Sequence, residues 1–181
     1  EADLVRKNAR GASWQRPNWP PKANGELVSA LDGDWGTVEK HFDKRTREKA
    51  AANGKAVAEA DVHQATRDSV RAIMMIRAYR MRGHYHANLD PLGITGMRDE
   101  ELRAQAYGFT EADLDRPIFL DNVLGLEFAT VRQMIDILER TYCQTMGVEF
   151  MHISDGYEKG WLQERIEGPD KGIAFTLEGR K

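Results

Sequence analysis

The sequence is short of several features that would place a protein in a class at once. Among its 181 residues there is one cysteine, Cys143, so no disulfide can form within the chain and a reducing compartment is expected. No run of about 18 apolar residues occurs, and no membrane span is expected. The first residues contain neither an apolar core like that of a signal peptide nor an initiator methionine. We expect the chain to be a piece of a longer protein.

Neither sign of charge dominates. The 26 lysines and arginines against 29 aspartates and glutamates give a net charge of −3 and a pI near 6.0, so neither nucleic acid nor a membrane surface is an expected partner. The sequence also has no glycine-rich phosphate loop, serine nucleophile elbow or zinc-finger spacing. What it does have is 41% hydrophobic residues, enough for the core of one domain, or of one domain with a tail.

Residues 1–61 differ from the rest of the chain. The stretch SWQRPNWPPKANGE holds three of the six prolines and two of the four tryptophans, and no apolar period follows it up to residue 61. This composition predicts an irregular tail or linker, partly docked or disordered. Some docking is expected because Trp14, Trp19 and Trp35 are large aromatic side chains that linkers rarely carry. The domain itself is then expected over residues 62–181.

A helix is predicted over residues 62–82. Asp61 can cap its first amide groups, and Gly83 can end it in the left-handed conformation that glycine adopts at little cost. Arg80 and Arg82 lie in the last turn, where positive charge suits the helix dipole. The face predicted to be buried comprises Val62, Thr66, Ser69, Val70, Ile73 and Ile76.

A second, clearer helix is predicted over residues 131–146. Thr130 and Gln133 form a capping-box pattern at its start, and Gly147 closes it. Its apolar stripe comprises Val131, Met134, Ile135, Leu138, Tyr142 and Thr145, and the opposite face carries Arg132, Asp136, Glu139 and Arg140. This separation of faces predicts a helix with one side in the core.

Shorter elements complete the predicted fold. Residues 110–113 resemble a short capped helix, and residues 117–128 fit either a small hairpin or an extended loop. Asp155 is expected to start a helix that stops at the Gly-Pro pair after residue 167, and Thr176 to start another. The apolar residues of the helix after Asp155 are Trp161, Leu162 and Ile166. The predicted fold class is mostly α: a small helical domain of about four helices, with a possible short hairpin near residues 118–128, preceded by an irregular tail.

Two groups of residues suggest chemistry, and each has a plainer interpretation. His84 and His86 form an H-x-H pair that could share a metal on a strand. Metal sites want three or four ligands, however, and the position after a helix end favours hydrogen bonds to the backbone. Cys143 would need a base to become a nucleophile, and His152 is nine residues away. A core or half-buried thiol is therefore favoured.

Arg77 and Arg80 lie on the apolar face of the first predicted helix. Two buried and unpaired guanidinium groups would cost too much, so a carboxylate partner is expected. Asp90 is the favoured partner because the chain can reverse after the helix and a proline fixes the backbone after Asp90; Asp121 or a group on another domain is the alternative. We predict a corner that is structural or contacts an anion, with no catalytic, cofactor-binding or metal-binding residue. It comprises Arg77, Arg80, His84 and Asp90.

Four stretches of the sequence are distinctive when taken together. They are MIRAYRMRGHYHANLDPLG, YGFTEADLD, RQMIDILERTYCQTMGVEFMHISD and EKGWLQERIE. In this order and spacing they resemble the first, decarboxylating component of the 2-oxoglutarate dehydrogenase complex. The resemblance runs from about Val62 to Glu178 and continues more weakly upstream, in SWQRPNWP.

The resemblance implies an enzyme of the citric acid cycle that uses thiamine diphosphate and Mg²⁺. Such an enzyme decarboxylates 2-oxoglutarate and passes the succinyl group to the lipoyl arms of dihydrolipoyl succinyltransferase. The resemblance further implies a homodimer, placed in the cytoplasm of a bacterium or in the mitochondrial matrix of a eukaryote.

In this family the matching region is the small helical domain ahead of the thiamine-binding domains. No residue here matches a catalytic position of the family. The resemblance therefore implies structural support for the remaining domains of the same protein, with no cofactor bound by this chain itself. The alternative is an interaction or regulatory module that binds an anionic effector or a partner protein at the corner of Arg77, Arg80 and His84.

Overall fold

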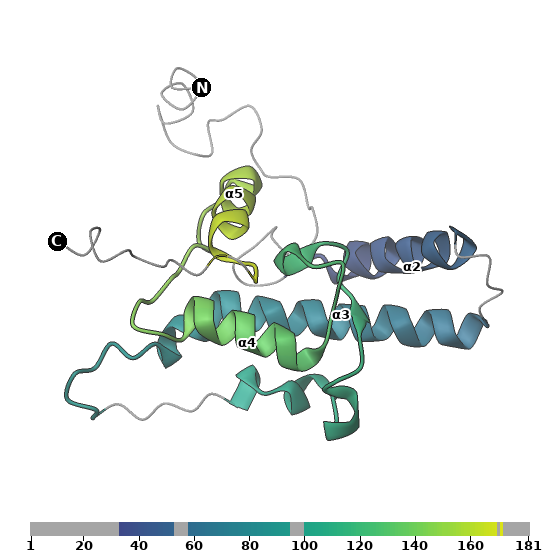
Figure 1. Ribbon diagram of the computed structural model, residues 1–181. Coiled ribbons are helices and arrows are strands. Elements are labelled where there is room, and N and C mark those ends of the chain that lie inside the picture. The colour runs from purple at the N-terminus through teal and green to yellow at the C-terminus, as the bar shows by residue number, and fades with distance from the viewer. Residues whose placement is uncertain (1–32, 53–57, 95–99, 170, 172–181) are drawn as a thin grey trace, which may run out of the picture.

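The computed structural model describes residues 33–52, 58–94, 100–169 and 171 (Figure 1). In these residues the α-helices are α2 (Trp35–Ala52), α3 (Glu59–Arg82), α4 (Val131–Tyr142) and α5 (Gly156–Ile166). The predicted fold class, mostly α with about four helices, is confirmed. The helix predicted to start at Thr176 lies outside the described residues, as do Trp14 and Trp19.

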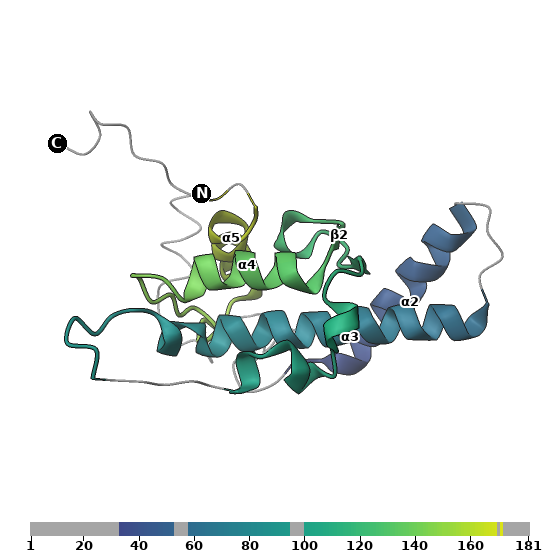
Figure 2. The ribbon, with the colours of Figure 1, turned by 60° about the horizontal axis from the view of Figure 1, so that its bottom comes forward.

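Helix α3 is the central element of the fold. It is the longest helix, with 24 residues, and α2 and α4 both pack along it (Figures 1 and 2). Its most deeply buried apolar side chains are Ala72, Ile73, Met75, Ile76 and Tyr79. These side chains pack in one hydrophobic core with the buried stripe of α4 and with the buried aromatic side chains next to α2. None of the helices in the described ranges combines the length and apolar composition needed to cross a membrane.

The predicted end of α3 at residue 82 is confirmed, but its predicted start and the predicted left-handed conformation of Gly83 are wrong. The helix begins at Glu59 with Ala58 as its N-cap residue, so Asp61 lies inside the first turn, where a carboxylate favours the helix dipole. Gly83 has φ −55°, a right-handed conformation, and the chain continues into the 3₁₀ helix η3 (Gly83–His86). Glycine is needed there for space: a Cβ atom at Gly83 would lie 2.5 Å from Cβ of Tyr142 on α4.

Helix α2 corrects the prediction that residues 1–61 are irregular. The carboxylate of Asp34 accepts a hydrogen bond from the amide of Thr37 at 3.2 Å, and the helix then runs to Ala52. Only Val38 and Phe42 of α2 are buried, so the sequence shows no apolar stripe to predict it from. The helix is nevertheless part of the core, and the helical part of the chain begins before residue 62. Docking is confirmed for Trp35, which packs against the core.

A short hairpin follows the 3₁₀ helices η4 (Glu100–Leu102), η5 (Ala104–Tyr107) and η6 (Glu111–Asp113). Strands β1 (Ile118–Phe119) and β2 (Phe128–Ala129) pair antiparallel, with Ile118 opposite Ala129 and Phe119 opposite Phe128. Of the two alternatives for residues 117–128, the hairpin is confirmed. Its loop includes the 3₁₀ helix η7 (Val123–Gly125) and has positive φ at Asp121, Asn122 and Leu124.

The predicted starts of the later helices are confirmed. Thr130 and Gln133 form the capping box of α4, and the carboxylate of Asp155 accepts hydrogen bonds from the amides of Tyr157 and Glu158 at the start of α5. Thr110 and Asp113 likewise form a capping box, on the 3₁₀ helix η6.

The predicted end of α4 is wrong. The helix stops at Tyr142, and Thr145, which was predicted to belong to the apolar stripe, is exposed. The buried face instead includes Ile137, which the predicted stripe left out. Beyond α4 the backbone is held by a distant segment, because the amide of Asn88 donates to the carbonyl of Gln144 at 2.6 Å. A tertiary contact thus takes over where the sequence pattern predicted another helical turn.

Candidate functional site

The most buried polar contact in the described structure joins three helix ends. Arg80, in the last turn of α3, has no exposed surface, and Glu167, just after α5, is 4% exposed. Nε and Nη2 of Arg80 donate to the two carboxylate oxygens of Glu167 at 2.7 and 2.8 Å, which is a bidentate pair. The hydroxyl of Tyr142, the last residue of α4, donates to the same carboxylate. We call Arg80, Tyr142 and Glu167 the buried cluster.

The buried cluster is suited to joining the three helix ends and not to proton transfer. Burial, and then the charge of Glu167, raise the pKa of Tyr142 well above its usual value. The hydroxyl therefore remains protonated and keeps donating to the carboxylate. The guanidinium of Arg80 neutralises Glu167 in a region without water contact, where an unpaired charge would be very costly.

The prediction was that Asp90 pairs with Arg77 or Arg80. The structure pairs Arg80 with Glu167, and the pairing of Asp90 with Arg77 stays a prediction. The Asp90 carboxylate accepts hydrogen bonds from the amides of Leu92 and Ile94, at 2.8 and 2.6 Å, within its own turn. An Asp before Pro-Leu-Gly is well suited to this local arrangement, which competes with any distant partner. The alternative partner, Asp121, instead meets Arg45.

The four residues of the predicted corner are only partly brought together. Arg77 and Arg80 both lie on the buried face of α3, as predicted. His84 begins the exit from the helix, with Nε2 3.9 Å from a carboxylate oxygen of Glu149. The carboxylate of Asp90 serves the turn beyond. A structural role fits Arg80 best, because a fully buried, bidentate guanidinium is not open to a dissolved anion.

The sequence pattern did not predict that Glu167 pairs with Arg80 or that the hydroxyl of Tyr142 joins the same cluster. Glu167 follows a helix end and is separated from Arg80 by 87 positions, so no local pattern connects them. A weak signal existed for Tyr142, because a tyrosine within an apolar stripe needs a hydrogen-bond partner for its hydroxyl.

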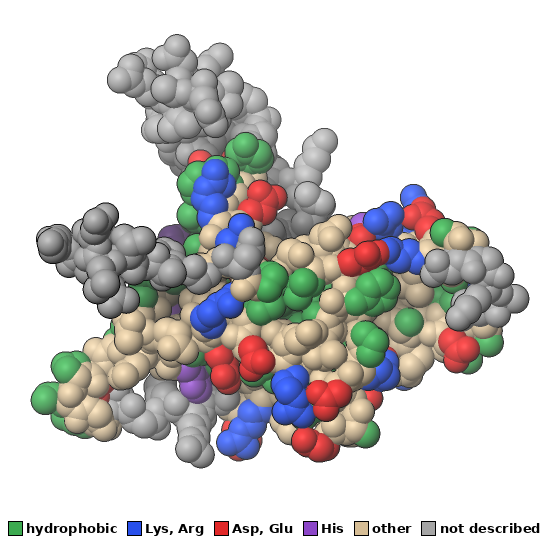
Figure 3. Space-filling view, viewed as in Figure 1, with side chains coloured by type: hydrophobic (Ala, Val, Ile, Leu, Met, Phe, Trp, Pro, Cys, Tyr) green, Lys and Arg blue, Asp and Glu red, His purple; other side chains and the backbone are tan. Residues whose placement is uncertain are grey.

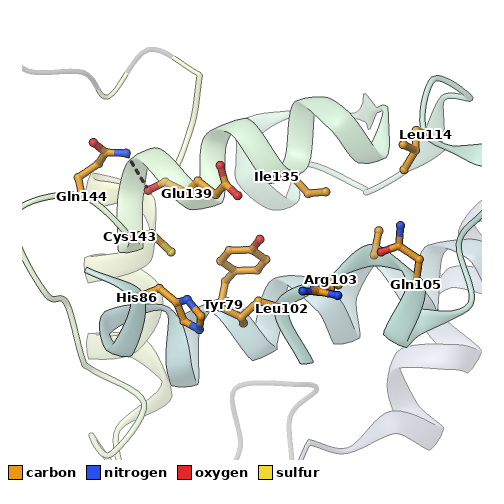
Figure 4. A pocket seen from close by; sticks show the side chains of 11 residues that line it. Tyr79, His86, Leu102, Arg103, Gln105, Leu114, Ile135, Glu139, Cys143 and Gln144 are labelled. Atoms are coloured by element: carbon orange, nitrogen blue, oxygen red, sulfur yellow. Dashed lines mark hydrogen bonds between the residues drawn. The ribbon is translucent and has the colours of Figure 1, made fainter. Parts of the chain in front are cut away.

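A separate groove lies between α4, the end of α3 and the 3₁₀ helices η4 and η5 (Figure 4). Its volume is about 570 Å³. Ile135 and Glu139 of α4 line one side and Tyr79 of α3 the other, as Figure 4 shows. The remaining lining residues are His86, Leu102, Arg103, Ala104, Gln105, Leu114, Cys143 and Gln144.

Cys143 is not an activated nucleophile in this groove. Burial, and then the charge of Glu139, raise the pKa of the Cys143 thiol to about 11, so the thiol is protonated at neutral pH. The thiol lies 3.5 Å from the carbonyl oxygen of Gly83 and donates to it. The expectation of a half-buried thiol is confirmed.

The described residues do not fit a divalent cation. Nowhere in residues 33–52, 58–94, 100–169 and 171 do three His, Cys, Asp or Glu side chains converge as metal ligands. His84 and His86 therefore lack the further ligands that a shared metal needs.

The comparison with known proteins confirms the resemblance found in the sequence. Over 99% of its length the chain is 64% identical to the 2-oxoglutarate dehydrogenase E1 component of Brucella anthropi. It is 63% identical, over the same share, to the proteins of that name from Brucella suis and Brucella abortus. The chain spans 19% of the length of these relatives, and the match lies in their N-terminal portion. No family model matches the chain.

Proposed function

We propose that this chain is the N-terminal helical part of a 2-oxoglutarate dehydrogenase E1 component. Such a protein oxidatively decarboxylates 2-oxoglutarate and passes the succinyl group to the lipoyl group of dihydrolipoyl succinyltransferase, in the citric acid cycle. The observation that carries the proposal is the 64% identity over 99% of the chain. Identity at this level over almost the whole chain is far more specific than any one motif.

Within that enzyme the chain supports the catalytic domains and does not itself catalyse. The strongest polar contact, between Arg80 and Glu167, is buried and internally satisfied. The cysteine thiol has a raised pKa, and the described residues offer no set of metal ligands. Thiamine diphosphate and Mg²⁺ accordingly belong to domains outside this chain, where the cofactor would supply the carbanion chemistry of decarboxylation.

The proposed assembly follows from the same relatives. The remaining domains of the same polypeptide are the first partner, a second copy completes a homodimer, and dihydrolipoyl succinyltransferase receives the product. The relatives are bacterial, which favours the bacterial cytoplasm over the mitochondrial matrix as the place of action. The anionic-effector alternative is not favoured, because Arg80 has no exposed surface.

The test compares the intact gene product with the isolated 181-residue chain. Release of CO₂ from 2-oxoglutarate is measured for both in the presence of thiamine diphosphate and Mg²⁺, and calorimetry measures cofactor binding. The intact product should release CO₂, and the isolated chain should neither do so nor bind the cofactor saturably. An inactive intact product would refute the proposed enzyme. Tight cofactor binding by the isolated chain would refute its supporting role.

A further inference from the structure

The described surface carries a group of large apolar side chains at one end of the molecule. The exposed fractions are 59% for Tyr85, 58% for Leu89, 77% for Leu92, 77% for Ile94 and 66% for Met146. We call these five residues the apolar knob. Four of them lie on the loop after α3, which projects beyond the helices (Figure 1) and presents hydrophobic side chains at its tip (Figure 3). Scattered apolar residues need no explanation, but such a group on one projection does.

Contacts between two segments bring the knob together. The amide of Asn88 donates to the carbonyl of Gln144 at 2.6 Å, which fixes the loop beside the chain that leaves α4. Leu89 packs over Gly147, where a Cβ atom would lie 3.3 Å from Cδ1 of Leu89. Met146, which is 66% exposed, precedes Gly147 in the chain, so an exposed apolar residue of the second segment lies close to this contact.

The tip of the knob is held in one shape. The Asp90 carboxylate accepts from the amides of Leu92 and Ile94, and the amide of Gly93 donates to the Asp90 carbonyl at 3.2 Å. Gly93 has φ +64°, which suits the turn. Leu92 and Ile94 are thus presented outward by an ordered turn, and a contact surface held in one shape loses little conformational entropy on binding.

The near absence of charge on this loop indicates which kind of surface could bind it. Asp90 is the only Asp, Glu, Lys or Arg between residues 83 and 94, and its carboxylate is already engaged with the backbone. The knob therefore offers apolar area and no charge for a partner to match. A socket lined by apolar side chains is its natural complement.

We propose that the apolar knob docks into the catalytic part of the same polypeptide. This inference rests on the proposed function, since the matched relatives are about five times as long as the aligned segment. A stable interface between free proteins uses about 20–30 residues on each side, far more than this knob offers. A tethered domain needs much less, because the tether provides an effective concentration in the millimolar range. The size of the knob thus favours an intramolecular partner over a second copy.

Hydrogen exchange tests the docking independently of activity. Amide exchange of residues 85–94 is measured in the intact gene product and in the isolated chain. The intact product should exchange at least about tenfold more slowly in this segment. The double variant L92D/I94D should remove that protection, while Y157D, at a side chain that is 78% exposed on α5, should leave it in place. Equal exchange in the two proteins would overturn the inference.

Two further measurements separate the alternatives. Sedimentation of the isolated chain at increasing concentration should show a monomer; a dimer abolished by L92D/I94D would make a second copy the occupant and overturn the intramolecular assignment. CO₂ release by the intact product reports on the proposed enzyme alone. CO₂ release without slowed amide exchange at residues 85–94 would reject the docking and leave the proposed enzyme standing. Slowed exchange without CO₂ release would reject the proposed enzyme and leave the docking standing.

Discussion

Two of the arginine–carboxylate contacts between distant segments of this protein differ chiefly in burial. Arg80 and Glu167 tie the ends of α3 and α5 without exposed surface on the arginine. Arg45 and Asp121 tie α2 to the hairpin loop, with the arginine side chain 40% exposed. The chemistry is the same, and both pairs are well aligned. Because the two pairs have similar geometry, burial is expected to decide how much stability depends on each of them.

The largest effect is expected for Glu167→Gln. The change removes the charged carboxylate that accepts two hydrogen bonds from the buried guanidinium of Arg80, and the free energy of unfolding should fall by about 3–5 kcal/mol. Urea unfolding measures the loss. Changing Arg80→Met in addition should recover part of it, because the buried positive charge that Glu167 neutralised is then gone. A loss below about 1 kcal/mol for the single variant would erase the contrast between the two pairs.

Leu138→Ala tests whether the core beside the buried cluster is as tightly packed as the cluster itself. Leu138 is fully buried on α4, and a large-to-small change in such a place costs about 2–5 kcal/mol. Glu139→Ala is the matched control on the neighbouring exposed position, with an expected cost of about 0.5 kcal/mol or less. Equal shifts in melting temperature for the two variants would contradict the observed helix face.

Gly83→Ala probes the crossing of α3 and α4 directly. The added Cβ would lie 2.5 Å from Cβ of Tyr142, so the two helices must move apart, at a cost of about 1–3 kcal/mol. Gly93→Ala is a useful contrast because there is no atom within 4 Å and only the positive φ opposes the change. A melting temperature unchanged in Gly83→Ala would show that the helices do not approach closely.

Of the two arginine–carboxylate pairs, the smaller effect is expected for Asp121→Asn at the partly exposed pair. The cost should be below about 1 kcal/mol, because solvent screens the contact. The hydrogen bond from Arg45 lowers the pKa of Asp121 below its usual value of 3.8. The stabilisation is therefore present above the unfolded-state pKa and is lost as pH falls through the lower, folded-state pKa. The stability difference between wild type and variant should shrink below about pH 4. A difference that grows in acid would contradict this sign.

The starts of η6, α4 and α5 were predictable because their signals are local. Thr130 and Gln133 lie three residues apart, and so do Thr110 and Asp113; both pairs form the capping boxes that their spacing predicts. Asp155 likewise caps the amides directly after it. The stripe of α4 was predictable for the same reason, since helical spacing alone placed Met134 and Leu138 in the core.

Helix α2 shows where local signals fall short. Its residues are good helix formers, but only Val38 and Phe42 are buried, so no apolar period distinguishes the helix from a polar linker. Its place is set by contacts with distant residues: Phe42 meets Phe119 edge to face at 5.9 Å, and Arg45 meets Asp121. The predicted domain boundary at residue 62 rested on the absence of an apolar period before that residue. The absence of a pattern is weaker evidence than the presence of one.

The sequence by itself determined the fold class, the family resemblance, the caps at Thr110, Thr130 and Asp155, and the presence of arginines on a buried helix face. Only the tertiary structure decided which carboxylate pairs with Arg80 and why residue 83 is glycine. Both answers depend on chain segments far apart in sequence, namely Glu167 after α5 and Tyr142 on α4. Capping and amphipathic patterns act over three or four residues and can be read locally. The partner of a buried charge is settled by which helix ends converge, and packing of the whole core fixes that.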